Sequence, residues 1–142
     1  MWWRQRTGDA AKNKDAMRSL VGGGDEPGLL AYANGVPVGW VSVGRRDNFG
    51  QLMRSPQYKP RDNDHQVFAV VCFYVDPRSK RSGVGSALLD GAIEWARRHG
   101  ATSIEAYPNS SSDFMGRREA FERRGFTRIR LAGKRSIVRL VL

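Results

Sequence analysis

A basic segment with two glycines, between residues 78 and 86, has residue types and spacing that suit anion binding. Gly83 and Gly85 follow Lys80 and Arg81, and an apolar helical pattern begins directly after them. Glycines let the backbone turn its N–H groups outward, and the N-terminus of a helix attracts anions. The segment therefore predicts a pocket for a phosphate or pyrophosphate. The competing interpretation is a tight strand-to-helix turn with incidental basic residues.

Two familiar nucleotide-binding motifs do not fit this segment. It lacks the third glycine of the dinucleotide fingerprint, and it lacks the Gly-Lys-Ser/Thr of a P-loop. Any phosphate that binds here is therefore held in another way.

The elements on either side must hold the segment in place. Val67–Val75 is β-branched and aromatic almost throughout, without the alternation of a half-exposed strand, so it predicts a central strand buried on both faces. After the segment, apolar residues recur with helical periodicity from Val84. This pattern predicts an amphipathic helix that ends near His99 and Gly100.

The remaining segments predict helices and hairpins around this unit. Asn34-Gly35 accepts positive φ at both central positions of a type I′ turn, so residues 29–33 and 36–43 predict a β-hairpin. The other expected elements are helices over Lys14–Val21 and Asp113–Arg124, a long loop with room for one helical turn over Arg45–Gln66, a strand over Ser103–Tyr107, and a hairpin of Phe126–Leu131 and Ser136–Leu142 around Ala132-Gly133. A parallel βαβ unit between antiparallel hairpins requires a mixed sheet.

Length and composition limit the class of protein. The chain has 142 residues, of which 40% are hydrophobic and 27% charged, which argues against a disordered chain and a disulfide scaffold. This length fits one domain, residues 1–142. The apolar runs are far shorter than the ~20 residues of a membrane span, and no secretory signal is evident. We therefore expect a cytoplasmic protein with no membrane partner.

The net charge is +10, from 24 Lys and Arg against 14 Asp and Glu. This charge would attract phosphates of nucleic acid, of a membrane surface or of an anionic cofactor. A nucleic-acid-binding module would also need exposed aromatic side chains for stacking. Most aromatic residues fall at expected core positions instead, among them Phe68, Phe73, Trp95 and Phe126. We therefore expect no specific nucleic-acid partner.

Metal chemistry has no support in the sequence. Cys72 is the only cysteine, and His65 and His99 are far from each other and from any Glu-x-x-His or His-x-His spacing. We therefore expect no metal and no disulfide within one chain.

The residues around the glycine segment resemble a known family. Residues 71–77, followed by Lys80-x-x-Gly83-x-Gly85, are similar to the acyl-CoA-binding motif of the GNAT superfamily of N-acetyltransferases, Arg/Gln-x-x-Gly-x-Gly/Ala. The similarity includes Gly125-Phe126 and the early hairpin, and it covers about residues 14–142.

This resemblance implies an α/β fold of the α+β type. It has a mixed, splayed central sheet of about six or seven strands with helices on both faces. The pantetheine arm would lie in the splay between residues 67–75 and 103–107, against main-chain groups of Phe73 and Val75. The residues that would hold the pyrophosphate are Lys80, Arg81, Ser82, Gly83, Val84, Gly85 and Ser86.

Three positions depart from the family's pattern. Lys80 stands where Arg or Gln is usual, which keeps a cation but loses a planar fork. Phe121 stands where many members carry the Tyr that protonates the leaving thiolate, and a phenyl ring cannot donate a proton. Phe114 stands where Asn is common. The resemblance therefore supports cofactor binding more strongly than the usual acid catalysis.

Acetyl transfer to an amine also needs a group that removes the ammonium proton. Glu105, on the strand at the expected splay, could act as this base directly or through one water; the alternative is a surface carboxylate paired with an arginine. Tyr74 and Tyr107 are the phenols nearest the expected site and could replace the missing Tyr. The alternative for each is a core or rim residue with a satisfied hydroxyl.

These observations predict an enzyme, an acetyl-CoA-dependent N-acetyltransferase that acts on a primary amine of a small molecule or peptide. A non-catalytic acyl-CoA sensor remains open because of Phe121, and a basic nucleic-acid-binding module is the third hypothesis. Acceptor choice would depend on loops such as residues 45–66. Trp2-Trp3 could cover a sheet edge or contact a second copy, so a homodimer also remains open.

Overall fold

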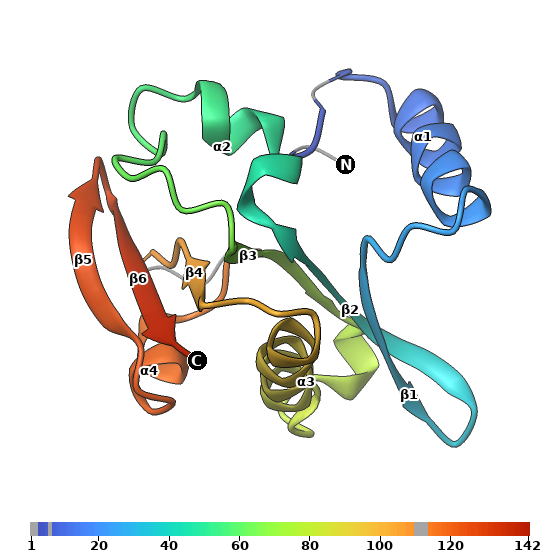
Figure 1. Ribbon diagram of the computed structural model, residues 1–142. Coiled ribbons are helices and arrows are strands. Elements are labelled where there is room, and N and C mark those ends of the chain that lie inside the picture. The colour runs from blue at the N-terminus through green and yellow to red at the C-terminus, as the bar shows by residue number, and fades with distance from the viewer. Residues whose placement is uncertain (1–2, 6, 110–113) are drawn as a thin grey trace.

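A computed structural model describes residues 3–5, 7–109 and 114–142 of the chain. Its helices and strands, shown in Figure 1, follow the chain in the order α1 (Ala10–Gly22), β1 (Gly28–Ala33), β2 (Val36–Arg45), η1 (Arg46–Asn48), α2 (Gly50–Arg54), β3 (Val67–Val75), η2 (Pro77–Ser79), α3 (Val84–Arg98), β4 (Ser103–Ala106), α4 (Arg118–Glu122), β5 (Thr127–Ala132) and β6 (Arg135–Val141).

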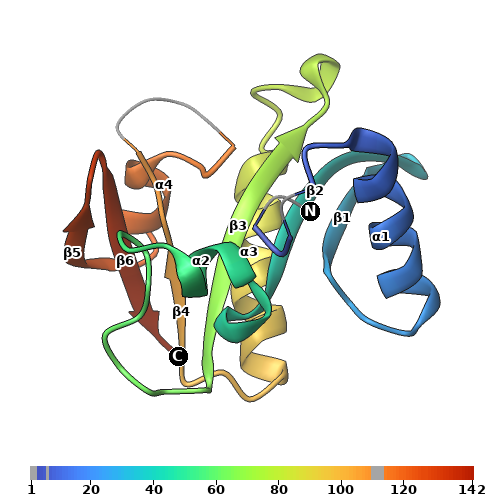
Figure 2. The ribbon, with the colours of Figure 1, turned by 90° about the horizontal axis from the view of Figure 1, so that it is seen from above.

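The strands form one six-stranded mixed sheet in the order β1-β2-β3-β4-β6-β5. The β3–β4 pair is parallel, and every other neighbouring pair is antiparallel. Only Val67–Val70 of β3 pair with β4, against Ser103–Ala106. Beyond these pairs the two strands diverge, as Figure 2 shows from above. The expected mixed, splayed sheet is therefore confirmed.

A β-bulge lies in β3 directly after the last β3–β4 pair. Ser42 pairs with Val71 and Val41 pairs with Phe73, which leaves Cys72 without a partner in β2. Cys72 has φ +58°, in the left-handed region that a non-glycine residue rarely adopts. An extra residue bends and twists the strand. The bulge therefore turns the second half of β3 away from β4 and helps to open the splay.

Each face of the sheet is covered by helices and carries its own core. On one face, α3 packs apolar residues that include Leu88, Leu89 and Ala92 against β2, β3 and β4. On the other face, Phe49 and Leu52 of the η1–α2 segment belong to a second buried cluster with residues of β3 and β6. The expectation of helices on both faces is confirmed.

The predicted early elements and central helix are confirmed, with small shifts. Asn34 and Gly35 both have positive φ, as a type I′ turn requires. Helix α1 begins at Ala10, where the Asp9 carboxylate accepts hydrogen bonds from two backbone N–H groups of the first turn. Helix α3 ends at Arg98, with His99 as its C-cap. The aromatic residues expected in the core lie there: Phe68 and Phe126 are buried, and Phe73 and Trp95 pack against the same cluster.

Two predicted segments are wrong in extent. Helix α4 covers only Arg118–Glu122, not Asp113–Arg124, and residues 110–113 lie outside the described part of the chain. Gly116 has φ +82°, and this left-handed residue interrupts any helix that would start earlier. The 45–66 segment contains two helical pieces, η1 and α2, rather than one turn, because β2 extends to Arg45 and the apolar side chains of Phe49 and Leu52 pack on the sheet.

Two smaller corrections concern strands. The terminal hairpin turns at Gly133-Lys134, not at Ala132-Gly133, because Ala132 still pairs with Arg135. Strand β3 is buried on both faces only in its first half; beyond the bulge, Tyr74 is 51% exposed because β4 no longer flanks it. In the described residues, no helix has the length and apolarity to cross a membrane.

Candidate active site

The loop between β3 and α3 has the geometry of an anion site. Arg81 and Gly83 have φ +64° and +83°, so the chain twists twice through the left-handed region before α3 begins at Val84. The first backbone N–H with an acceptor is that of Ala87, which donates to Gly83 O over 2.9 Å. The six preceding amides, of residues 81–86, donate to no other described residue. These donors can bind an anion at the N-terminus of α3.

The basic side chains of this loop differ in their partners. Arg78 is paired with Asp76, which lowers the pKa of that carboxyl through the Arg78 hydrogen bonds. Lys80 and Arg81 are exposed and form no ion pair with any described residue. Both cations therefore remain available to a phosphate, while Arg78 stabilises the turn.

The start of α3 lies close to the sheet at glycine positions. A Cβ at Gly39 of β2 would lie 2.7 Å from Val84 Cγ1, so only glycine permits this approach. A Cβ at Gly85 would meet only Val75 Cγ2, at 4.0 Å. The backbone of the loop therefore lies directly beyond the end of β3, with open space at Gly85.

One of the two main-chain groups predicted to bind pantetheine at the splay already has a hydrogen-bond partner. Phe73 N–H, predicted to bind pantetheine, donates to Phe114 O over 2.5 Å. Val75 lies at the end of β3, where it pairs with Gly39. The Phe114 side chain is 67% exposed, so this residue contacts the splay through its backbone. A pantetheine arm that used Phe73 N–H would have to displace the Phe114 carbonyl.

Phe121 is a core residue in this fold. It is 1% exposed, and its ring forms edge-to-face contacts with Phe73 and Phe126, with centroids 6.1 and 5.3 Å apart. The phenyl ring therefore stabilises α4 against the splay through packing.

Glu105 is not a surface carboxylate. Its side chain is 4% exposed, and Oε1 accepts hydrogen bonds from Arg46 Nη1 at 3.2 Å and from Arg139 Nη2 at 2.5 Å. Oε2 accepts from Tyr107 OH at 2.9 Å. It lies opposite Ala69, inside the paired part of β3 and β4 rather than in the open splay. The pairing with arginine that the sequence left open is present, but buried.

Tyr107 follows directly after the last β4 residue, at the base of the splay. It is fully buried, its hydroxyl donates to Glu105, and its carbonyl accepts from Arg135 Nη1 at 3.2 Å. Burial, and then the charge of Glu105, raise the pKa of the Tyr107 phenol well above its usual range. The phenol is therefore a neutral hydrogen-bond donor at every physiological pH.

The structure brings Glu105 and Tyr107 together and separates them from Tyr74. Tyr74 lies beyond the bulge on β3, is half-exposed, and hydrogen-bonds to neither residue in the described part of the chain. Of the two candidate phenols, only Tyr107 is coupled to the candidate base.

Three residues around Glu105 were missed by the sequence analysis: the buried Arg46, the half-buried Arg139 and the more exposed Asp62. Asp62 binds Arg46 Nη2 at 2.5 Å and Arg139 Nη2 at 2.7 Å, and so links both arginines that hold Glu105. The Arg46 hydrogen bond is the main cause that lowers the pKa of Asp62 far below its usual range. The one sequence signal was Arg139, a lone cation inside the apolar run 137–141.

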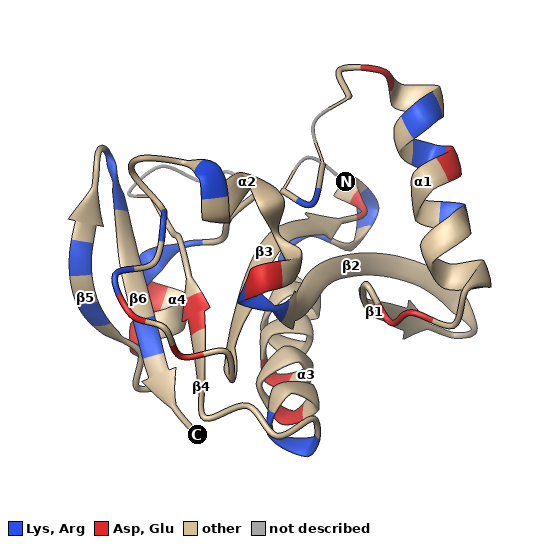
Figure 3. Ribbon diagram, turned by 45° about the horizontal axis from the view of Figure 1, so that its top comes forward, with Lys and Arg blue, Asp and Glu red and all other residues tan. Residues whose placement is uncertain are grey.

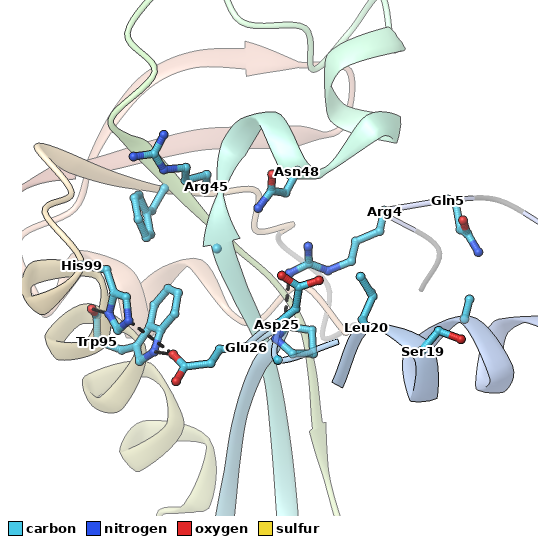
Figure 4. Close-up of a pocket in the computed structure, with 15 residues that line it drawn as sticks. Arg4, Gln5, Ser19, Leu20, Asp25, Glu26, Arg45, Asn48, Trp95 and His99 are labelled. Carbon is cyan, nitrogen blue, oxygen red and sulfur yellow. Dashed lines mark hydrogen bonds and ion pairs between the residues drawn. The ribbon is translucent and has the colours of Figure 1, made fainter. Parts of the chain in front are cut away.

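Two of the cavities in the described part of the chain differ in their relation to the candidate site. The larger, of about 970 Å³, lies beside the C-terminal end of α3, where Trp95 Nε1 donates to Glu26 over 2.9 Å (Figure 4). It contains none of the predicted site residues. The smaller, of about 220 Å³, contains Glu105 and its partner Arg46. The smaller cavity is therefore the one that belongs to the candidate site.

The sequence also left open the role of Trp2-Trp3 and predicted that no metal is bound. Trp3 packs edge-to-face on Tyr58, with centroids 5.7 Å apart, while Trp2 lies outside the described residues. Across the described ranges, no three His, Cys, Asp or Glu side chains are grouped so that they could hold a metal ion.

Solved structures with this fold are numerous. The paia N-acetyltransferase of Thermoplasma acidophilum, solved with coenzyme A, is 12% identical, with a TM-score of 0.66 over 94% of this chain and 72% of that one. The yncA protein of Salmonella typhimurium, solved with its cofactor acetyl-CoA, is 22% identical, with a TM-score of 0.63 over 99% and 78%.

The ribosomal-protein-alanine N-acetyltransferase of Brucella melitensis is 17% identical, with a TM-score of 0.64 over 99% of this chain and 83% of that one. At these identities the likeness shows the fold. Among curated proteins, no sequence match is found.

A comparison with protein-family models identifies the family as well as the fold. Residues 1–126 match the model of the acetyltransferase (GNAT) family, which is most of the chain. The match includes β3, the glycine loop and α3, the elements that form the anion site described above. The chain therefore belongs to the acetyltransferase (GNAT) family, whose enzymes transfer an acetyl group from acetyl-CoA.

Proposed function

We propose that this enzyme, as a single domain of residues 1–142, transfers the acetyl group of acetyl-CoA to a primary amine of a small molecule or peptide. The observation that carries the proposal is the run of unpaired amides at residues 81–86, between the splayed end of β3 and α3. These amides would hold the pyrophosphate, with Lys80 and Arg81 adding positive potential.

The pantetheine arm would lie in the splay between β3 and β4. Val75 would offer main-chain groups to its amides, and Phe73 N–H would do so after exchange of its bond to Phe114 O. The thioester would then lie near the bulge at Cys72 and near Tyr107, at the base of the splay.

Three proton and electron movements complete the reaction. The amine must lose a proton first, because an alkyl ammonium with a pKa near ~10.4 is mostly charged at pH 7 and is not nucleophilic. The neutral amine attacks the thioester carbonyl, the C–S bond breaks as the tetrahedral intermediate collapses, and the second proton of the nitrogen passes to solvent or to the departing CoA thiolate. A thiol with a pKa near ~8.5 is a fair leaving group, so a dedicated acid is dispensable.

Glu105 and Tyr107 would divide the proton transfers. We assign Glu105 as the acceptor of the amine proton, directly or through a water, and Tyr107 OH as the neutral donor closest to it. Tyr74, exposed beyond the bulge, remains the second candidate for the donor. Phe121 has no part in proton transfer.

Calorimetry with CoA tests the cofactor site. Gly85→Val is expected to abolish binding, because the side chain would fill the space through which a pyrophosphate approaches the backbone. A Cβ at Gly85 meets only one atom within 4 Å, so the protein itself can accommodate the change. Gly91→Ala, on the same helix with its Cβ in ordinary contact with Leu29, is the matched control. Unchanged CoA affinity in Gly85→Val would contradict the proposed site.

Thiol release from acetyl-CoA against a panel of amines, antibiotics and peptides tests the reaction. Turnover of any amine supports an enzyme, and tight CoA binding without turnover favours a sensor. The nucleic-acid alternative has its own outcome: we expect DNA affinity that is weak, indifferent to sequence and steeply lost with added salt. Sequence-selective DNA binding that survives ~200 mM salt would instead favour the nucleic-acid-binding module over the acetyltransferase.

A further inference from the structure

The connection between β2 and β3 has an unusual course. These strands are antiparallel neighbours, which are commonly joined by about two to five residues. Here residues 46–66 intervene and cross the sheet instead, as Figure 2 shows. Arg130 of β5 anchors this segment by donating to Gln57 O at 2.7 Å and to Lys59 O at 2.8 Å. The segment thus covers β4, β6 and β5 at the candidate site.

A cavity of about 220 Å³ lies beneath this covering segment. Its walls combine apolar side chains such as Ile137 with five charged residues, Arg46, Arg61, Asp62, Glu105 and Arg130. The volume is sufficient for a small polar molecule but not for a macromolecule. The cavity therefore has room for a small group of a ligand.

The charges around the cavity favour an anion. Both lining carboxylates, Asp62 and Glu105, are already bound by Arg46 and Arg139. Arg61 lines the same cavity, is exposed, and forms no ion pair with a described residue. Figure 3 shows further basic positions along β5 and β6. Positive charge therefore exceeds negative charge at this end of the sheet.

Arg46 adds buried positive charge to the wall of the cavity. Its side chain is 3% exposed, its two Nη atoms are bound to Asp62, Glu105 and Asp64 O, and its buried Nε–H has no hydrogen-bond partner among the described residues. Guanidinium groups bind carboxylates and phosphates well. Because the Nε atom is closed off from solvent, Arg46 would act on a bound anion through its charge, and the guanidinium of Arg61 would bind it directly.

The same cavity reaches the proposed base. Glu105 forms part of its wall, and Tyr107, bonded to Glu105, lies at the base of the splay. If the ammonium of an acceptor lies near Glu105, a second functional group of the same molecule, a few atoms from the nitrogen, would lie near Arg46 and Arg61. We propose that the acceptor is a small amine that carries a carboxylate or phosphate, and that this anionic group binds in the cavity at Arg61, in the positive potential of Arg46 and Arg130. This inference rests on the proposed function.

The first experiment compares four amines of similar length. β-Alanine carries a carboxylate, O-phosphoethanolamine a phosphate, ethanolamine a neutral hydroxyl and ethylenediamine a second ammonium. We expect kcat/KM for one of the two anionic amines to exceed that for ethanolamine by about tenfold or more, with ethylenediamine poorest. The better of the first two identifies the anionic group. Equal or higher kcat/KM for ethanolamine or ethylenediamine would overturn the inference.

The second experiment changes the charge of one lining residue. Arg61→Glu is expected to lower the ratio of kcat/KM for the preferred anionic amine over that for ethanolamine by about tenfold. Arg54→Glu is the matched control, because Arg54 is an exposed arginine of the same segment that does not line the cavity. An unchanged ratio in Arg61→Glu, or an equal fall in Arg54→Glu, would contradict the assignment.

Calorimetry separates this inference from the function on which it rests. β-Alanine and O-phosphoethanolamine are titrated into the protein with and without CoA. CoA binding without heat from either amine overturns the anion site and leaves the cofactor site intact. Absence of CoA binding overturns the proposed function, while binding of an anionic amine that is weakened by Arg61→Glu still supports the cavity.

Discussion

The two halves of the candidate site differ in the kind of group that would bind a ligand, backbone amides in one and side chains in the other. On the half proposed to bind the cofactor, the candidate binding groups are backbone amides of residues 81–86, next to each other in the sequence and fixed by two left-handed residues and a helix start. On the half proposed to bind the acceptor, they are side chains that reach one point from η1, the 55–66 segment, β4 and β6. A local backbone site tolerates side-chain changes, whereas a site of converging charges depends on each member.

The difference also concerns burial. The cofactor loop is exposed, and its cations Lys80 and Arg81 are surrounded by solvent. Arg46 and Glu105 are almost fully buried. The charge of Glu105 is compensated by Arg46 and Arg139, and the charge of Arg46 is compensated by Glu105 and Asp62. Removal of one buried partner leaves an uncompensated charge, which costs much more than the loss of a surface contact.

The largest expected effect is therefore on the acceptor half. Arg46→Met leaves Glu105 buried with Arg139 as its remaining cation, and it should lower the free energy of unfolding by about 3–5 kcal/mol. Urea unfolding followed by tryptophan fluorescence measures this change. Arg45→Met, an exposed neighbour in β2, is the control and should stay within about 0.5 kcal/mol of the wild type. A loss in Arg46→Met as small as that of the control would show that the network is not structurally important.

A second prediction concerns the rate. Glu105→Gln removes the proposed proton acceptor and should lower kcat by roughly 10²-fold, while CoA affinity stays unchanged because the cofactor half is separate. Rates are compared at equal concentrations of folded protein, since Glu105 also binds Arg46 and Arg139. Full activity in Glu105→Gln together with loss in Tyr107→Phe or Tyr74→Phe would assign proton transfer to a phenol.

The difference between a local backbone site and a site of converging side chains also explains which parts of the structure could be predicted from the sequence. The strand Val67–Val75, the turn at Asn34-Gly35 and helix α3 follow from periodicity and turn chemistry, which act over neighbouring residues. Gly83 and Gly85 lie at the start of that helix, as the sequence predicts, and the assignment of this loop to the cofactor stays a prediction. These predictions needed no knowledge of which distant segments meet.

The acceptor half depends on tertiary contacts, and its sequence signals were weak. Glu105 and Tyr107 were identified, but not the cluster of Arg46, Asp62 and Arg139 around them, because nothing local specifies that the 46–66 segment crosses the sheet. The bulge at Cys72 was missed for a related reason. Its left-handed φ is imposed by pairing on both sides, not by a glycine that the sequence would reveal.

A third prediction uses pH to test the network. Arg46 and Arg139 lower the pKa of Asp62 relative to its unfolded value of about 3.9. Its stabilising effect is therefore present above that pH and is lost as the pH falls. Since the Asp62 side chain is 39% exposed, solvent screening limits the contribution to roughly 1 kcal/mol. Asp62→Asn should start less stable at pH 7 and lose less stability than the wild type towards pH 2.

Urea unfolding at a series of pH values measures this effect. Asp15→Asn is the control, since Asp15 pairs only with Arg18 on the exposed surface of α1. This variant should follow the wild-type curve. An Asp62→Asn curve that runs parallel to the wild type at every pH would show that the Asp62 carboxylate is not coupled to folding.

The smallest expected effect is a side-chain change on the cofactor half. Lys80→Ala removes an exposed cation from the anion site but leaves all six backbone donors of residues 81–86 in place. CoA affinity should therefore fall only about threefold, in contrast to the loss expected for Gly85→Val, and the difference should shrink as salt screens the charge. Calorimetry at low and high salt measures both effects. A Lys80→Ala variant that binds CoA as poorly as Gly85→Val would mean that the cofactor half, like the acceptor half, depends on its side chains.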